Sequence, residues 1–339
     1  MKPETQEEKL NRIRKERQDA GVIEAFAPNI DIENIKPFNI VDMFKMDFPP
    51  VKHIVEPCID EDTINIVHAK RGVGKTYFCM SLAYAIATGQ DFLKWKIKNS
   101  YPTLYLDGEM MPIKITNRFK NIINTFPNDP ESVPLYILPK TYYRDVNIKI
   151  TNIEIQNLIM DFIRENKIKV LVVDNISSLT NGIVENEAIA WEEYLDWEVK
   201  VRNMGVTVIR VMHSGKGKEA SIRGSSKTED GADSIMKLVD LNPDDDMSDE
   251  ARYLRFKLIF TKAREFFGEE ARPFEAHMIN NKYGEPNWIV KDPSQTKEEM
   301  IAQLFKEGYD RKSIMDLADV TKGYLSKIEK KLNSSKIVI

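Results

Sequence analysis

Cysteine and histidine are scarce in this sequence. Its 339 residues include two cysteines, Cys58 and Cys79, and four histidines. So few thiols exclude a disulfide-stapled scaffold, and the small supply of thiols and imidazoles excludes a zinc module built from several such ligands. The scarcity favours a protein of the reducing cytosol.

Glycine, proline and long apolar runs are also in short supply. With 15 glycines, 16 prolines and 42% hydrophobic residues, the chain is neither collagenous nor of low complexity, and it can build a core. The longest apolar patch, residues 79–87, is far shorter than the roughly 20 residues that span a bilayer. Residues 1–21 are too polar for a signal peptide. We therefore expect a soluble cytoplasmic protein without membrane contact.

Neither sign of charge is in large excess. The chain has 49 basic and 53 acidic residues, for a net charge of -4. This balance excludes a globally basic surface that grips nucleic acid, so any such binding has to use a local patch.

The order of the predicted elements defines the fold class. Five strand-like segments alternate with four helix-like segments. The strands are residues 63–68, 103–107, 135–138, 169–174 and 207–213, and the helices are residues 75–87, 113–124, 153–166 and 187–203. This alternation predicts right-handed βαβ units and a doubly wound, mostly parallel sheet of the α/β class. We expect residues 253–262, 273–279 and 288–290 to add antiparallel strands at one edge.

The last part of the sequence predicts a small all-α module that resembles a helix-turn-helix. Three helices are expected at residues 297–306, 311–318 and 322–332, around a core of Leu317, Val320, Leu325 and Ile328. Two uses stay open, duplex DNA binding and docking to a partner protein. The predicted division is an N-terminal arm or linker at 1–39, an α/β domain at 40–290 and the helix-turn-helix-like module at 291–339.

Residues 69–76, Ala-Lys-Arg-Gly-Val-Gly-Lys-Thr, lie between a predicted strand and a predicted helix, the context of a P-loop. Glycines let backbone N–H groups close around phosphate oxygens, and the helix N-terminus adds its positive dipole end. Lys75 is placed to reach the β- and γ-phosphates of ATP, and the Thr76 hydroxyl to bind Mg²⁺. Ala69 stands where the motif usually begins with glycine, which leaves the geometry of the loop open. An ordinary glycine-rich turn is the competing interpretation.

The predicted nucleotide site combines this loop with a carboxylate. Asp174 ends the apolar strand 169–174 and is the expected metal residue beside Thr76. Its alternative role is a helix cap. The expected ATP-binding residues of the loop are Arg71, Gly72, Val73, Gly74, Lys75, Thr76 and Tyr77.

Several segments together resemble RecA-type ATPases, nearest the RepA-type and DnaB-type hexameric replicative DNA helicases. The resemblance covers roughly residues 40–290 and implies a RecA-like ATPase domain there. It is carried by residues 48–76, 83–93, 104–119, 208–238 and 261–269.

The resemblance implies roles for individual residues. Glu109 would be the catalytic base that orients the attacking water, and His213 the γ-phosphate sensor. Arg118 would contact the nucleotide or a subunit interface. The alternatives are a helix-terminal acid for Glu109 and a structural histidine for His213.

Two further features of the resemblance concern assembly and DNA. Lys262 and Arg264 match the family's Lys-x-Arg pair, in which an arginine finger completes a neighbouring subunit's site. The resemblance therefore implies a homo-oligomer, and a hexamer as in the family. An exposed pair on an edge strand is the alternative.

Residues 214–227 would be the channel loop that tracks single-stranded DNA. They contain one acid, Glu219, against the basic residues Lys216, Lys218, Arg223 and Lys227.

The first functional hypothesis is therefore an ATP-dependent DNA helicase that translocates on single-stranded DNA by hydrolysing ATP at subunit interfaces. The second is a regulatory, ATP-switched DNA-binding protein of replication or initiation that does not unwind DNA. A recombinase is a third hypothesis, but residues 223–226 and the lead-in to the P-loop are nearer the helicases.

Overall fold

The computed structural model describes residues 37–126, 132–180, 188–215, 222, 229–241, 254–280, 286–291 and 295–334. The chain divides into two compact units, Met1–Val51 and Lys52–Ile339. In the first unit, the described element is the short helix α2 (Ile40–Met43), which begins where the Asn39 side chain accepts a hydrogen bond from the Val41 amide. Residues 1–36 of the predicted arm lie outside the described residues. None of the described helices has the length and apolarity that crossing a bilayer requires.

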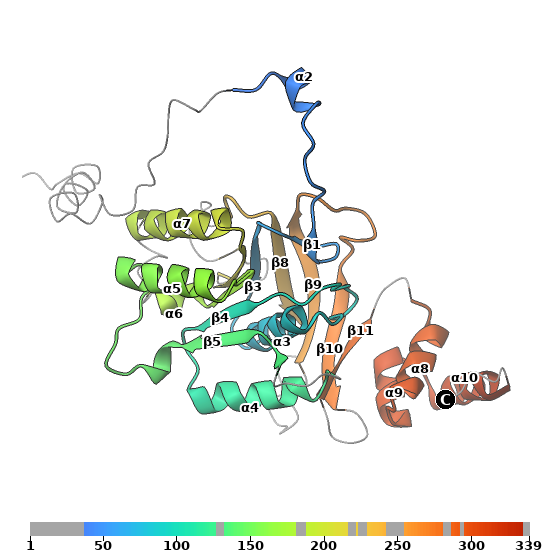
Figure 1. Cartoon of the computed structure of the whole chain (residues 1–339). Helices are drawn as coiled ribbons and strands as arrows, with labels where there is room; N and C mark the ends of the chain where they lie inside the picture. The colour runs from blue at the N-terminus through green and yellow to red at the C-terminus, as the bar shows by residue number, and fades with distance from the viewer. Residues whose placement is uncertain are drawn as a thin grey trace, which may run out of the picture. The chain divides into compact units, whose positions relative to one another are not determined.

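The second unit is built on a nine-stranded sheet with the order β11-β10-β9-β8-β3-β7-β6-β4-β5 (Figure 1). The six strands from β8 to β5 are parallel, and β9, β10 and β11 are antiparallel. Their bounds are β3 Ile64–Ala69, β4 Thr103–Asp107, β5 Leu135–Pro139, β6 Val170–Asp174, β7 Thr207–His213, β8 Ser234–Asp240, β9 Leu254–Ala263, β10 Phe274–Asn280 and β11 Pro286–Lys291. The predicted α/β class with a mostly parallel sheet is confirmed, as is the antiparallel edge.

Helices cover both faces of this sheet. Val67 and Val172 pack with α3 (Lys75–Thr88) and α4 (Pro112–Ile123) in one apolar cluster. The neighbouring residues Ile66 and Leu171 point the other way and pack with α5 (Ile153–Glu165) and α7 (Ala188–Asn203). Successive strand residues alternate between faces, so a strand covered on both sides is apolar on both, as residues 170–173 of β6 are before the strand ends in Asp174.

Besides α2, three small elements of the second unit were not expected from the sequence. They are the hairpin of β1 (His53–Val55) and β2 (Ile59–Asp60), the 3₁₀ turn η3 (Lys140–Tyr142), and α6 (Ile176–Leu179). Each is too short to show a repeat of polar and apolar residues, which is why the pattern of the sequence does not reveal them.

The C-terminal module consists of α8 (Lys297–Lys306), α9 (Arg311–Ala318) and α10 (Lys322–Ser334). The first two helices have the predicted bounds, because Thr296 forms a capping box with Glu299 and Asp310 caps α9. The predicted core residues lie in one apolar cluster, which also includes Ile279 of β10 and Ile289 of β11. The module thus packs against the antiparallel edge of the sheet. The domain boundary at residue 290 stays a prediction.

An ion pair is fully buried between α7 and β7. Glu198 accepts hydrogen bonds from Arg210 Nε (2.9 Å) and Tyr194 Oη (2.8 Å), and it also pairs with the Arg210 Nη2 atom. The guanidinium lies over the Trp191 ring, 5.2 Å from its centroid. Both charged side chains are shielded from water, with exposures of 0% for Arg210 and 1% for Glu198.

Arg210→Met is expected to destabilise the fold by about 3–5 kcal/mol, because it leaves the Glu198 carboxylate buried without its partner. Combining it with Glu198→Leu should restore most of the stability, since an apolar pair has no charge to desolvate. Urea unfolding followed by circular dichroism measures both effects as shifts of the transition midpoint. A single variant that unfolds at the wild-type midpoint would contradict this account of the pair.

Candidate functional site

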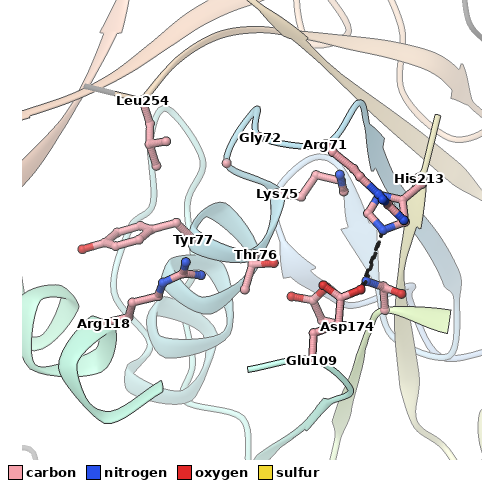
Figure 2. A pocket seen from close by; sticks show the side chains of 12 residues that line it. Arg71, Gly72, Lys75, Thr76, Tyr77, Glu109, Arg118, Asp174, His213 and Leu254 are labelled. Atoms are coloured by element: carbon pink, nitrogen blue, oxygen red, sulfur yellow. Dashed lines mark hydrogen bonds and ion pairs between the residues drawn. The ribbon is translucent and has the colours of Figure 1, made fainter. Parts of the chain in front are cut away.

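A cavity of about 540 Å³ opens at the carboxyl ends of the central parallel strands (Figure 2). The strand register gathers its polar groups, because Ala69 of β3 pairs with His213 of β7 and Asp107 of β4 pairs with Asp174 of β6. The lining residues are Arg71, Gly72, Gly74, Lys75, Thr76, Tyr77, Glu109, Arg118, Asp174, Asn175, His213 and Leu254. Most residues that the sequence assigned to nucleotide binding and catalysis therefore surround one cavity.

The turn between β3 and α3 requires glycine at two positions. Gly72 and Gly74 have φ angles of 85° and 104°, in the region that other residues rarely adopt. A Cβ atom at Gly74 would also lie 2.9 Å from the Leu254 side chain. These glycines let the chain turn tightly into α3, whose first N–H groups have no partners within the helix and can bind an anion.

The Lys75 ammonium group is held inside this turn. Its Nζ donates to the carbonyl oxygens of Ala69 and Lys70, both at 3.0 Å. Burial lowers the pKa of Lys75, while the nearby Asp174 carboxylate opposes that shift. A buried cation satisfied by loop carbonyls is suited to exchange them for the oxygens of a phosphate.

Asp174 lines the same cavity as Lys75, and the two opposite charges interact. Its Oδ2 accepts a hydrogen bond of 2.6 Å from the Tyr105 hydroxyl, and Thr76 also hydrogen-bonds to this carboxyl. Burial raises the pKa of Asp174, and the bonds from Tyr105 and Thr76 oppose that rise. The Thr76 and Asp174 oxygens are thus adjacent, as a shared metal shell requires.

Glu109 enters the cavity from the turn that follows β4. Its Oε1 accepts hydrogen bonds from Ser178 Oγ (2.6 Å) and Asn175 Nδ2 (2.8 Å), and it lies 4.0 Å from His213 Nε2. His213 and the bonds from Ser178 and Asn175 together lower the pKa of Glu109 to about 2. The group is therefore a fixed carboxylate that can accept a hydrogen bond from water.

The backbone of the Glu109 turn is anchored by Asp107. One carboxylate oxygen of Asp107 accepts hydrogen bonds from the Glu109 amide (3.1 Å) and the Met110 amide (2.6 Å). Burial raises the pKa of Asp107 to about 7. Asp107 therefore shapes the turn that presents Glu109, and it does not line the cavity itself.

The opposite end of the cavity has a different character. Tyr77, Arg118 and Leu254 lie there, away from Glu109 and His213 (Figure 2). The Tyr77 ring packs edge-on against Trp288, with ring centroids 6.4 Å apart. An aromatic ring, a guanidinium group and an apolar side chain together suit a planar nucleobase.

Other predicted site residues lie elsewhere. Val73 is buried in the apolar core at 3% exposure, so its side chain cannot touch a ligand, although its backbone belongs to the turn. Lys216, Lys218, Arg223 and Lys227 lie outside the described residues.

Lys262 and Arg264 lie at the opposite end of the sheet from the cavity, where the parallel strands begin. Lys262 pairs with Ile235 at the start of β8, and Arg264 Nη1 lies 3.0 Å from Asp233 Oδ1, beside the start of β3. The length of β3, about 16 Å at 3.3 Å per residue, separates this end of the sheet from the cavity.

The sequence alone did not single out Asn175, Ser178, Tyr105 or Leu254. A signal existed for the first two, because Asn175 follows the apolar strand and its Oδ1 caps α6 by accepting from the Ser178 amide at 3.0 Å. Nothing in the sequence indicated Leu254, since its place over Gly74 depends on the pairing of distant strands.

The residues present fit a nucleotide with a magnesium ion. The Gly72 turn is open, since a Cβ there would meet no atom within 4 Å, and Lys75 is held only by loop carbonyls among the bonds described. No group of three or more His, Cys, Asp or Glu side chains in the described part of the chain could hold a metal by itself. Thr76 and Asp174 would therefore share the ion with phosphate oxygens and water.

The fold and this cavity define a P-loop nucleotide-binding domain with the groups needed for nucleotide hydrolysis. A family model described as an AAA domain (AAA_25) matches residues 32–219, more than half of the chain. The chain belongs to this family of P-loop ATPases.

One solved structure with a similar fold is that of the KaiC-like protein PH0186 from the hyperthermophilic archaeon Pyrococcus horikoshii OT3. It is 16% identical, with a TM-score of 0.48, over 71% of this chain and 100% of that chain. A likeness of this degree says nothing about activity.

Proposed function

We propose that the protein is an ATP-dependent DNA helicase, a motor that moves along single-stranded DNA by hydrolysing ATP where subunits meet. The observation that carries the hydrolytic part is the position of Glu109. Its carboxylate is fixed by Ser178 and Asn175 in the cavity that also holds Lys75. A fixed base facing a phosphate-binding turn is the arrangement that water attack on a phosphoryl group needs.

Each residue then has a defined task in this proposal. Lys75 exchanges its carbonyl partners for phosphate oxygens, and Glu109 orients the attacking water and accepts its hydrogen bond. His213, which Asn175 approaches at 3.3 Å, responds to the occupied cavity. Thr76 and Asp174 would hold a magnesium ion, which would neutralise charge on the phosphates.

The proposed assembly is supported by the position of Lys262 and Arg264. Since about 16 Å of strand separates them from their own cavity, neither side chain reaches it within one chain. A neighbouring subunit could bring its Arg264 to this site, as the resemblance to hexameric helicases suggests. The proposed active unit is therefore a homo-oligomer, a hexamer in this interpretation.

Contact with DNA is proposed for residues 214–227. Ser214, the first of them, donates its amide to the carbonyl of Ala69 at 2.9 Å, the same oxygen that accepts from Lys75. A nucleotide that draws Lys75 away would change the surroundings of this anchor. The C-terminal module is proposed to recruit an initiator or a primase.

Strand displacement on a tailed duplex tests the proposal. Wild-type protein should unwind the duplex with ATP and magnesium, and Lys75→Ala, Glu109→Ala and Arg264→Ala should each abolish unwinding. The measurement is the release of a fluorescent strand over time. A wild type that hydrolyses ATP and binds DNA but unwinds no tailed substrate of either polarity would support the ATP-switched regulatory protein instead.

A further inference from the structure

Two tyrosines are exposed side by side at the end of the edge strand β5. Tyr142 and Tyr143 have exposures of 65% and 43%, and their ring centroids are 5.1 Å apart at an interplanar angle of 85°. They follow the carboxyl end of β5, the side of the sheet on which the cavity opens. Exposed rings of this size cost free energy in water unless a partner covers them.

The charge around these rings favours a polyanion. Residues 140–149 contain Lys140, Arg144 and Lys149 against a single acid, Asp145. Arg144, the next residue along the chain after the two rings, is exposed. Cations for the phosphates and aromatic faces for the bases are the combination that binds single-stranded nucleic acid without sequence preference. A duplex, whose bases are already stacked, could use only the cations.

The first two residues of this segment, Lys140 and Thr141, are hydrogen-bonded to residues that position Glu109. Lys140 Nζ donates to the carbonyl of Ser178 at 2.5 Å, and Ser178 Oγ donates to Glu109 Oε1 at 2.6 Å. Thr141 Oγ1 donates to the carbonyl of Met110, the residue after Glu109, at 2.5 Å. A ligand that shifts residues 140–143 therefore acts on the two segments that position the catalytic carboxylate.

We propose that residues 140–149 form a binding site for single-stranded nucleic acid, with bases stacking on Tyr142 and Tyr143, and that its occupation adjusts Glu109 through Lys140 and Thr141. The inference rests on the proposed function but adds a second contact, apart from residues 214–227. Lys140 and Thr141 are positioning residues in this scheme, since they act on Glu109 through Ser178 and Met110.

The double variant Tyr142→Ala/Tyr143→Ala tests the site. Anisotropy with a fluorescein-labelled oligothymidylate should show binding weakened roughly tenfold or more, and the stimulation of ATP turnover by the oligonucleotide should fall with it. Basal turnover should stay within about twofold, because neither ring touches the cavity. Tyr142→Phe/Tyr143→Phe keeps the rings and should behave as wild type. Leu158→Ala, which removes an exposed apolar side chain from α5, is the matched control.

Lys140→Met tests the connection separately. It should reduce the stimulation of turnover more than it weakens oligonucleotide binding, because it removes the bond to Ser178 and leaves the rings. Equal loss of both would overturn the proposed connection.

The remaining outcomes separate the two proposals. If the wild type binds and is stimulated but the double alanine variant matches it, the site is wrong and the helicase proposal stands. If the double variant instead lowers the oligomer mass in sedimentation and leaves oligonucleotide affinity unchanged, the rings contact another copy of the chain and the site is overturned. If the wild type neither binds nor responds to the oligonucleotide, the proposed function fails, and this inference fails with it.

Discussion

Arg264→Ala is expected to lower the kcat of ATP hydrolysis by roughly 10³–10⁵-fold, the range in which arginine fingers act. Arg264 cannot contribute within its own subunit, because the length of β3 separates it from the cavity. Its charge would instead stabilise the phosphoryl group in a neighbour's site. Steady-state phosphate release measures the loss, and melting temperature shows whether the variant is folded.

Arg272→Ala is the matched control for this prediction. Arg272 lies on the same β9–β10 connection, is similarly exposed (44% against 49% for the Arg264 side chain), and pairs with Glu269 at 2.5 Å. Removing this exposed ion pair should cost at most about 1 kcal/mol of stability and leave turnover intact.

Mixing two inactive variants tests the neighbour's contribution directly. Lys75→Ala subunits retain Arg264, and Arg264→Ala subunits retain the P-loop, so mixed oligomers contain some complete sites. Partial recovery of turnover on mixing is expected. An Arg264→Ala protein as active as wild type, or a mixture that stays inactive, would contradict a shared site.

Glu109→Gln is expected to lower kcat by roughly 10²–10⁴-fold while leaving nucleotide affinity nearly unchanged. The amide keeps the shape of the side chain but cannot accept a proton, and the phosphate-binding contacts of Lys75 and Thr76 remain. Turnover and the Kd of a fluorescent nucleotide are measured on the same protein. Glu154→Gln, an exposed glutamate in the first turn of α5, is the control.

The pH dependence follows from the low pKa of Glu109. Because His213 and two hydrogen-bond donors lower that pKa to about 2, the carboxylate stays ionised well below its ordinary titration range. Wild-type kcat should therefore show no loss through protonation of Glu109 between about pH 8 and about pH 5. For the Glu109→Gln variant described above, a kcat equal to that of the wild type would contradict a catalytic role for Glu109.

Local sequence patterns predicted the elements that surround the cavity. The start of α3 at Lys75 and its end at Gly89 follow from the glycines there, and Gly89 has the left-handed conformation expected of a cap. The pattern also placed Lys75 and Asp174 in one predicted sheet, whereas Glu109 and His213 were indicated by the resemblance to RecA-type ATPases and not by the pattern.

What sequence could not predict depends on contacts between distant residues. The bond from Ser178 to Glu109 joins residues 69 positions apart, and the packing of Leu254 on Gly74 needs the pairing of β8 with β9. The contact of Ile279 and Ile289 with the C-terminal module is of the same kind. No periodicity within one segment contains this information.

Phosphate release from ATP and magnesium by wild-type and Lys75→Ala proteins tests the central claim most directly. The account predicts steady turnover by the wild type and turnover at background level by a folded Lys75→Ala variant, because the ammonium group in the 72–76 turn holds the transferred phosphoryl group. A wild type that never consumes ATP, even with single-stranded DNA present, or a Lys75→Ala protein that hydrolyses at the wild-type rate, would contradict it.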